Sequence, residues 1–234
     1  MTNRKVLCLY AAVFTCGIIL SGCANSGADM KAAKEARLAG DYEKAQAELE
    51  PMAAFGLPDA QVELAVILLQ NKDASQADLD KARGLLERAS TKEYAPAYSY
   101  LGRLYARGMG VPKNIKAAED NYNRAIALGY TRSVNDLAQM YEKEKDYKRA
   151  EGLYRQAYGS HYYRAAKNLA RLSEKGLGVE RDPVVALSWY IAAQRHGIGG
   201  LDKKVEDLKN TLGPNKVSQA EALSEGYDVD EKVQ

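Results

Sequence analysis

The sequence has few of the residues that form cross-links, metal centres and active sites. Its 234 residues include three cysteines and two histidines. Cys8 and Cys16 lie inside an N-terminal apolar run, so removal of that run leaves Cys23 alone and excludes an intramolecular disulfide. Stability must then come from packing. Only six prolines occur, whereas tyrosine is present 16 times, which is typical of an all-helical chain with tyrosine as its large packing residue.

An arrangement of catalytic residues is missing as well. His161 and His196 have no second histidine or cysteine at the spacing of a metal site, and no serine lies in a Gly-x-Ser-x-Gly motif. We expect His161 to be a surface turn residue and His196 to end a helix. The sequence therefore predicts a protein that is not an enzyme and has no metal or cofactor. An enzyme or enzyme activator acting on glycans is the less favoured alternative.

Long hydrophobic runs are also missing, except at the N-terminus. Val6 to Leu20 form an apolar stretch that is shorter than the roughly 20 residues of a membrane-spanning helix. Arg4 and Lys5 precede it and small residues follow it. This order of charge, apolar stretch and small residues predicts a cleaved export signal.

The end of this run, Leu20-Ser21-Gly22-Cys23, resembles the lipobox of bacterial lipoproteins. The resemblance implies cleavage before Cys23 and acyl chains such as palmitate on that residue. Each buried methylene contributes roughly 0.8 kcal/mol, so two or three chains anchor a protein almost permanently. In such lipoproteins an aspartate after the cysteine favours the inner membrane. Because Ala24 stands there, we expect an anchor in the outer membrane, facing the periplasm; the alternative is an ordinary secretory signal with a coincidental cysteine.

Outside the predicted signal peptide, neither positive nor negative charge is in excess. The chain has 33 Lys and Arg against 31 Asp and Glu, and Arg4 and Lys5 account for the difference. The expected mature chain is therefore neutral, and nothing in its charge indicates nucleic acid as a partner.

A repeat extends over most of the remaining sequence. Apolar triads at i, i+4 and i+7, which share one helical face, recur every 32 to 37 residues. A second helical pattern precedes each triad, with a leucine anchor at Leu64, Leu101, Leu137 or Leu169 in the last four. The sequence therefore predicts five helical hairpins. Their triads are Ala45-Leu49-Met52, Ala82-Leu86-Ala89, Ala118-Tyr122-Ala125, Ala150-Tyr154-Ala157 and Ala186-Tyr190-Ala193.

Glycine loops join the helices of two hairpins. Residues 107–112 and 175–179 both contain Gly-x-Gly-Val, in which glycine favours a helix stop. With Leu101-Gly102 and Trp189-Tyr190, these loops resemble Sel-like repeats, which are longer relatives of tetratricopeptide repeats. The resemblance implies an all-α fold, a right-handed α-solenoid of about five helix-turn-helix repeats with a C-terminal capping hairpin.

These patterns divide the chain into five segments. The segment after the last repeat is predicted to be a cap, because terminal units of a repeat array need one polar face. The predicted segments are a lipoprotein signal peptide in 1–22, a tether in 23–29, the repeat solenoid in 30–198, capping helices in 199–226 and a flexible tail in 227–234.

In tetratricopeptide arrays the first helix of each hairpin lines an inner groove. Carried over to the positions around each leucine anchor, this resemblance implies a groove that begins with apolar Val62, Val66 and Leu69 and then becomes basic. A concave basic surface attracts anionic partners. Alternatively, its bases pair with groove acids such as Glu142 and Glu174. The candidate binding residues are Arg103, Arg107, Arg132, Asn135, Gln139, Lys143, Arg164, Lys167 and Arg171.

A repeat array without catalytic residues favours a binding function. We expect a non-enzymatic scaffold for protein partners, with an outer-membrane porin or envelope complex and an anionic polysaccharide as hypotheses. Residues 53–65 are similar to the start of the alginate-export lipoprotein family, which implies assistance in assembling a polysaccharide export complex. A Sel-like protein that binds envelope or host proteins is the alternative.

Overall fold

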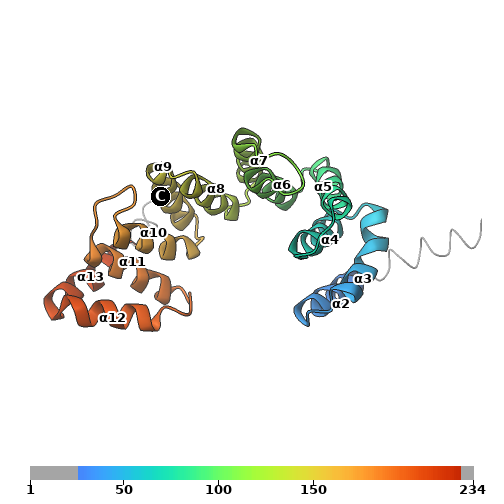
Figure 1. Cartoon of the computed structure of the whole chain (residues 1–234). Coiled ribbons are helices and arrows are strands. Elements are labelled where there is room, and N and C mark those ends of the chain that lie inside the picture. The colour runs from blue at the N-terminus through green and yellow to red at the C-terminus, as the bar shows by residue number, and fades with distance from the viewer. Residues whose placement is uncertain (1–25, 228–234) are drawn as a thin grey trace, which may run out of the picture. The chain divides into compact units, whose positions relative to one another are not determined.

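The structure is a computed structural model that describes residues 26–227. Over this range the chain forms twelve α-helices and no β-strand, which confirms the predicted all-α fold (Figure 1). The predicted signal peptide, Cys23 and residues 228–234 of the predicted tail lie outside the described residues.

Along the chain the helices alternate as the first and the second helix of each repeat. Every predicted triad lies on a second helix, and the last two helices follow the last repeat. The helices are α2 (Ser26–Leu38), α3 (Tyr42–Phe55), α4 (Pro58–Gln70), α5 (Gln76–Ser90), α6 (Ala95–Arg107), α7 (Ile115–Ala127), α8 (Arg132–Lys143), α9 (Tyr147–Gly159), α10 (Arg164–Lys175), α11 (Pro183–Arg195), α12 (Asp202–Leu212) and α13 (Pro214–Gly226).

The chain divides into two compact units at the start of α7, one ending at Ile115 and the other beginning at Lys116. We call them the N-terminal and the C-terminal unit and describe each by itself. Helices α2 to α6 belong to the N-terminal unit, and helices α7, apart from Ile115, to α13 belong to the C-terminal unit.

The core of the N-terminal unit is centred on α4. Side chains on several sides of this helix are buried, and Gln61 among them donates a hydrogen bond to the carbonyl of Ala53 at 3.1 Å. Val62 and Val66, expected in an exposed apolar groove, are 4% and 5% exposed. This expectation was wrong because both side chains pack within the hydrophobic core of the unit.

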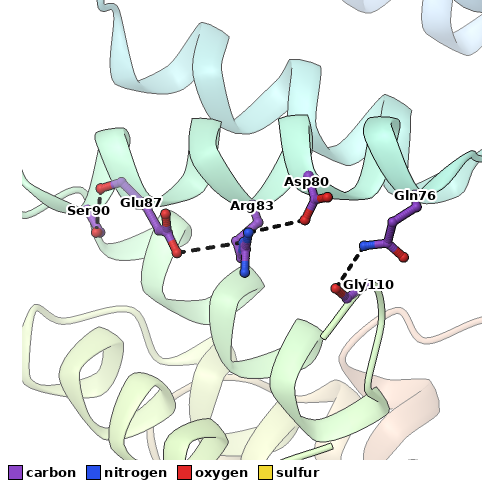
Figure 2. Close-up of polar contacts among 6 residues, drawn as sticks. All are labelled: Gln76, Asp80, Arg83, Glu87, Ser90 and Gly110. Carbon is purple, nitrogen blue, oxygen red and sulfur yellow. Dashed lines mark hydrogen bonds and ion pairs between the residues drawn. The ribbon is translucent and has the colours of Figure 1, made fainter. Parts of the chain in front are cut away.

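Two glycines allow loops to approach a neighbouring hairpin. A Cβ added to Gly110 would lie 2.6 Å from Leu79 Cβ on α5, and one added to Gly178 would lie 2.6 Å from the carbonyl carbon of Tyr147 on α9. Both glycines also have positive φ, 70° and 73°, which other residues rarely adopt. The amide of Gln76 completes the first contact by donating to Gly110 O at 3.0 Å (Figure 2).

Two segment boundaries differ from the prediction. Helix α2 begins at Ser26, inside the predicted tether. Tyr227, assigned to the flexible tail, stacks on Trp189 of α11 with ring centroids 3.7 Å apart, and its hydroxyl is 2.9 Å from Ser188 Oγ. Burial of a large ring against another aromatic residue stabilises this end of the chain.

Candidate functional site

The first helices of the C-terminal unit are joined by charged side chains. Glu142, in the last turn of α8, accepts two hydrogen bonds from the guanidinium of Arg171 on α10, at 2.6 and 2.5 Å. Tyr154 of α9 donates its hydroxyl to the same carboxylate at 2.8 Å. The acid thus connects its own hairpin with the next one.

The same arrangement occurs one repeat later. Glu174 stands on α10 where Glu142 stands on α8, five residues after the leucine anchor. It accepts a hydrogen bond from the hydroxyl of Tyr190 on α11 at 3.1 Å and forms an ion pair with Lys204 of α12. We call these two acids, with their tyrosines and bases, the carboxylate ladder.

The pKa values within the ladder indicate a structural role. Burial would raise the pKa of Glu142, but hydrogen bonds from Arg171 and Tyr154 lower it below the usual value. The hydrogen bond to Glu142 raises the pKa of Arg171. Burial and then the negative charge of Glu142 raise the pKa of Tyr154. Burial and then the negative charge of Glu174 raise the pKa of Tyr190. Near neutral pH the Glu142–Arg171 pair is therefore charged and both tyrosines are protonated, which suits packing rather than proton transfer.

Two of the candidate binding residues are used internally. Arg171 has the groove acid Glu142 as its partner, as the alternative interpretation proposed. Asn135 is 2% exposed and accepts a hydrogen bond from Asn168 Nδ2 of α10 at 3.1 Å. Because both face the neighbouring first helix, they stabilise the stack and present little surface to a partner.

Exposed polar and basic side chains remain on α8 and α10. Gln139 and Lys143 are exposed on α8, and Arg164 and Lys167 are exposed in the first turn of α10. Arg132, at the start of α8, forms an ion pair with Asp136 at 3.6 Å. We call Lys143, Arg164 and Lys167 the basic face.

The remaining candidates belong to the N-terminal unit. Arg103 is half-buried on α6, and its guanidinium lies 4.2 Å above the ring of Tyr100. Arg107 is exposed in the last turn of the same helix. Leu69 occupies the Glu142 position of the preceding hairpin, so no acid stands there for Arg103.

The two histidines meet at one tyrosine, a contact that their sequence separation does not suggest. His196 ends α11, as predicted, and its ring stacks on Tyr163 at 3.5 Å. The Tyr163 hydroxyl is 2.9 Å from Nδ1 of His161, an exposed residue with φ of 61°. No group of three or more potential metal ligands occurs among residues 26–227.

Comparison with known proteins identifies the repeat. The all-α hairpins with their Gly-x-Gly loops put the chain in the class of helical-repeat proteins. Four segments, residues 58–94, 95–130, 133–159 and 164–197, match the Sel1 repeat. Together they span more than half of the chain, which therefore belongs to the Sel1 repeat family. No curated protein sequence matches the chain at a significant level.

Solved structures show the same fold. A Sel1 repeat protein from Oxalobacter formigenes is 24% identical with a TM-score of 0.53, over 76% of this chain and 72% of that one. A Sel1 repeat protein from Klebsiella pneumoniae subsp. pneumoniae is 19% identical with a TM-score of 0.53, over 77% and 91%. A protective antigen of uropathogenic Escherichia coli with an SLR fold is 22% identical with a TM-score of 0.50, over 85% and 52%.

Family membership gives the general role of the chain. Sel1 repeats generally mediate protein–protein interaction, and proteins built from them are generally non-enzymatic scaffolds. The chain is accordingly a protein-interaction scaffold. Between residues 26 and 227, none of the helices combines the length and the apolar character that crossing a membrane requires.

Proposed function

We propose that the chain is a lipid-anchored scaffold at the periplasmic side of the outer membrane and that its basic face holds an acidic partner protein. One observation carries the binding part. After the internal pairs of α8 and α10 are assigned, Lys143, Arg164 and Lys167 remain exposed on two first helices that the ladder joins. Exposed charge of one sign on adjoining helices attracts partners of the opposite sign.

The membrane part of the proposal rests on the N-terminal sequence. Arg4 and Lys5, the apolar run and the lipobox ending in Cys23 support an acylated N-terminus. Ala24 supports the outer membrane by its resemblance to lipoproteins with that destination. The scaffold is then held near partners embedded in, or passing through, that membrane.

The partner has two candidate settings. The similarity of residues 53–65 to alginate-export lipoproteins supports a polysaccharide export complex, in which the basic face meets an acidic porin segment or the anionic polymer itself. The alternative is a Sel-like protein that binds envelope or host proteins. The likeness in fold to a protective antigen of uropathogenic Escherichia coli favours that alternative only by analogy.

The basic face is tested by charge reversal that leaves the ladder intact. Lys143→Glu, Arg164→Glu and Lys167→Glu are combined, and binding to polyglutamate and to alginate oligosaccharide is measured by titration at low salt. We expect affinity for the preferred probe to fall at least about tenfold. The control combines Lys148→Glu, Lys203→Glu and Lys216→Glu, which change the net charge equally at exposed sites elsewhere in the unit. An equal loss in the control contradicts a localised binding face.

The anchor is tested separately in cells. Cys23→Ser removes the acylation site, so we expect the protein to leave the membrane fraction for the soluble fraction of the envelope. Retention of Cys23→Ser in the membrane fraction contradicts lipidation but leaves the basic face untouched.

A further inference from the structure

Phe55 is the one phenylalanine outside the predicted signal peptide, and its side chain is on the surface. The sequence has two phenylalanines, Phe14 and Phe55. Phe55 ends α3 and is 61% exposed, although burial of a phenylalanine ring is strongly favourable. An exposed ring with further apolar groups beside it is typical of a surface that contacts a protein or a membrane.

The exposed neighbours of Phe55 on the last turns of α3 are uncharged, with one exception that is already paired. Pro51 lies about one turn earlier and Ala54 directly precedes Phe55, and both are exposed. The exception is Glu50, whose carboxylate pairs with Lys81 of α5 at 2.7 Å. We call Pro51, Ala54 and Phe55 the α3 tip.

The hairpin of α2 and α3 brings the α3 tip close to the start of the described chain. The two helices are antiparallel neighbours joined by residues 39–41 (Figure 1). The last turn of α3 therefore lies beside the first turn of α2, which begins at Ser26. Only Ala24 and Asn25 separate Ser26 from Cys23. Because an extended chain spans at most about 3.6 Å per residue, Cys23 stays within about 11 Å of the start of α2.

A lysine lies at the same end of the N-terminal unit. Lys92 is exposed, and its ammonium donates a hydrogen bond to the carbonyl of Gly56, the residue after Phe55, at 2.6 Å. A lysine beside apolar groups suits the head-group region, where its stem is buried and its ammonium stays wet. Acidic Asp59 and Glu93 are close by along the chain. Net charge therefore does not select what this end contacts, and the apolar side chains must do so.

The opposite end of the same hairpin offers a comparison. Leu38, in the last turn of α2, is 79% exposed. Exposed acids stand near it in the sequence, namely Glu35, Asp41 and Glu43. At 1.5 Å per residue, α2 places Leu38 about 18 Å from Ser26. Leu38 is thus an exposed apolar residue of the same hairpin that lies far from the start of α2.

We propose that the α3 tip lies in the surface of the membrane that holds the acylated N-terminus, with the ring of Phe55 among the lipids and Lys92 at the head groups. This inference rests on the lipid anchor of the proposed function. The short link to Cys23 holds the tip within reach of the bilayer, and such surfaces enter it by roughly 5–10 Å. The chain passes into the C-terminal unit only after α6, so α3 is not at the junction of the units. Contact at the tip turns the connection between α2 and α3 away from the bilayer.

The test attaches an acyl chain chemically, so that its result does not depend on acylation in cells. The mature chain, in which Cys23 is the only cysteine, is coupled at that thiol to one myristoyl chain, which gives weak and reversible membrane binding. Partition into vesicles of phosphatidylethanolamine and phosphatidylglycerol is measured by flotation. We expect Phe55→Ser to weaken partition at least about fivefold. The matched control, Leu38→Ser, leaves partition unchanged.

The depth of the ring is measured on the same vesicles. Phe55→Trp and Leu38→Trp each add a fluorophore to a chain whose own Trp189 is 3% exposed. With lipids that are brominated near the head groups, we expect the fluorescence added at position 55 to fall at least about twofold. The fluorescence added at position 38 is unaffected. Circular dichroism verifies that all four variants stay folded.

Three results overturn the proposal: wild-type partition of Phe55→Ser, equal weakening by Leu38→Ser, or no quenching at position 55. A tip that contacts a partner protein or the C-terminal unit instead gives the first and the third of these results. Retention of Cys23→Ser in the membrane fraction of cells contradicts the anchor, whereas these three results contradict the contact of the tip with the anchor supplied. The two failures are therefore distinguished.

Discussion

The two units hold successive first helices together with different side chains. Five residues after the leucine anchor, the N-terminal unit has Leu69 and Ala106, whereas the C-terminal unit has Glu142 and Glu174. In the former, α4 is buried among apolar neighbours. In the latter, each acid pairs with a base of the next first helix and with a tyrosine of its own hairpin. One repeat position therefore accepts either an apolar or an ionic contact.

In a repeat array, a basic residue on a first helix does not by itself mark a binding surface. A charged residue on a first helix belongs to the stack or to a partner depending on the residue one repeat earlier. Arg171 has Glu142 at that place, whereas Arg103 has Leu69 and lies over Tyr100 instead. Counting basic residues alone overestimates the surface that is open to a partner.

The largest expected losses of stability are at two loop glycines, one in each unit. Gly178→Ala forces a Cβ against the backbone of Tyr147, and we expect it to lower the free energy of unfolding by about 3 kcal/mol. Gly110→Ala would place its Cβ 2.6 Å from Leu79 Cβ, an atom fixed to the backbone of α5, so we expect a similar loss of about 3 kcal/mol. Urea unfolding followed by circular dichroism measures both.

Gly129→Ala is the control for these two variants. Its φ of 82° is also positive, but no atom lies within 4 Å of an added Cβ, so only the backbone penalty of about 1 kcal/mol remains. A loss at Gly178 no larger than at Gly129 contradicts the close approach of that loop.

The ladder is tested by removing its charge. Glu142→Gln leaves the partly buried Arg171 without a carboxylate, and we expect a loss of about 2 kcal/mol. Leu69→Gln, at the same position of the N-terminal unit, loses about 1 kcal/mol of apolar burial. Adding Arg171→Met to Glu142→Gln should recover stability, because the unpaired charge is removed as well. Additive losses in the double variant contradict coupling between the two side chains.

The pH dependence of stability separates the units further. The pKa of Glu142 is lowered in the folded protein from an ordinary value of 4.5, so its contribution is fully present above that pH and is lost as the pH falls through the folded pKa. We expect Glu142→Gln to lose less stability than wild type below about pH 4.5. Leu69→Gln should follow the wild-type pH profile. Parallel profiles for all three proteins contradict the assigned role of Glu142.

The sequence predicted the hairpins well because each depends on local patterns. The triads mark the second helices, and the Gly-x-Gly loops mark two of the turns. The site was harder to predict, since Asn135 and Arg171 find their partners 33 and 29 residues away along the chain. Which face of a first helix turns toward its neighbour depends on packing between hairpins, and this packing also buries Val62 and Val66. Tyr227 could not be placed from composition alone, because the surface that receives it lies on α11.

The smallest expected change in stability is at the interior glycines of two second helices, one in each unit. Gly84 of α5 and Gly152 of α9 occupy the same repeat position, and neither has an atom within 4 Å of an added Cβ. We expect Gly84→Ala and Gly152→Ala each to raise the free energy of unfolding by about 0.5–1 kcal/mol, because alanine favours the helix and meets no obstacle. Urea unfolding measures this gain, and a loss of stability at Gly84 would show that folding itself requires the glycine.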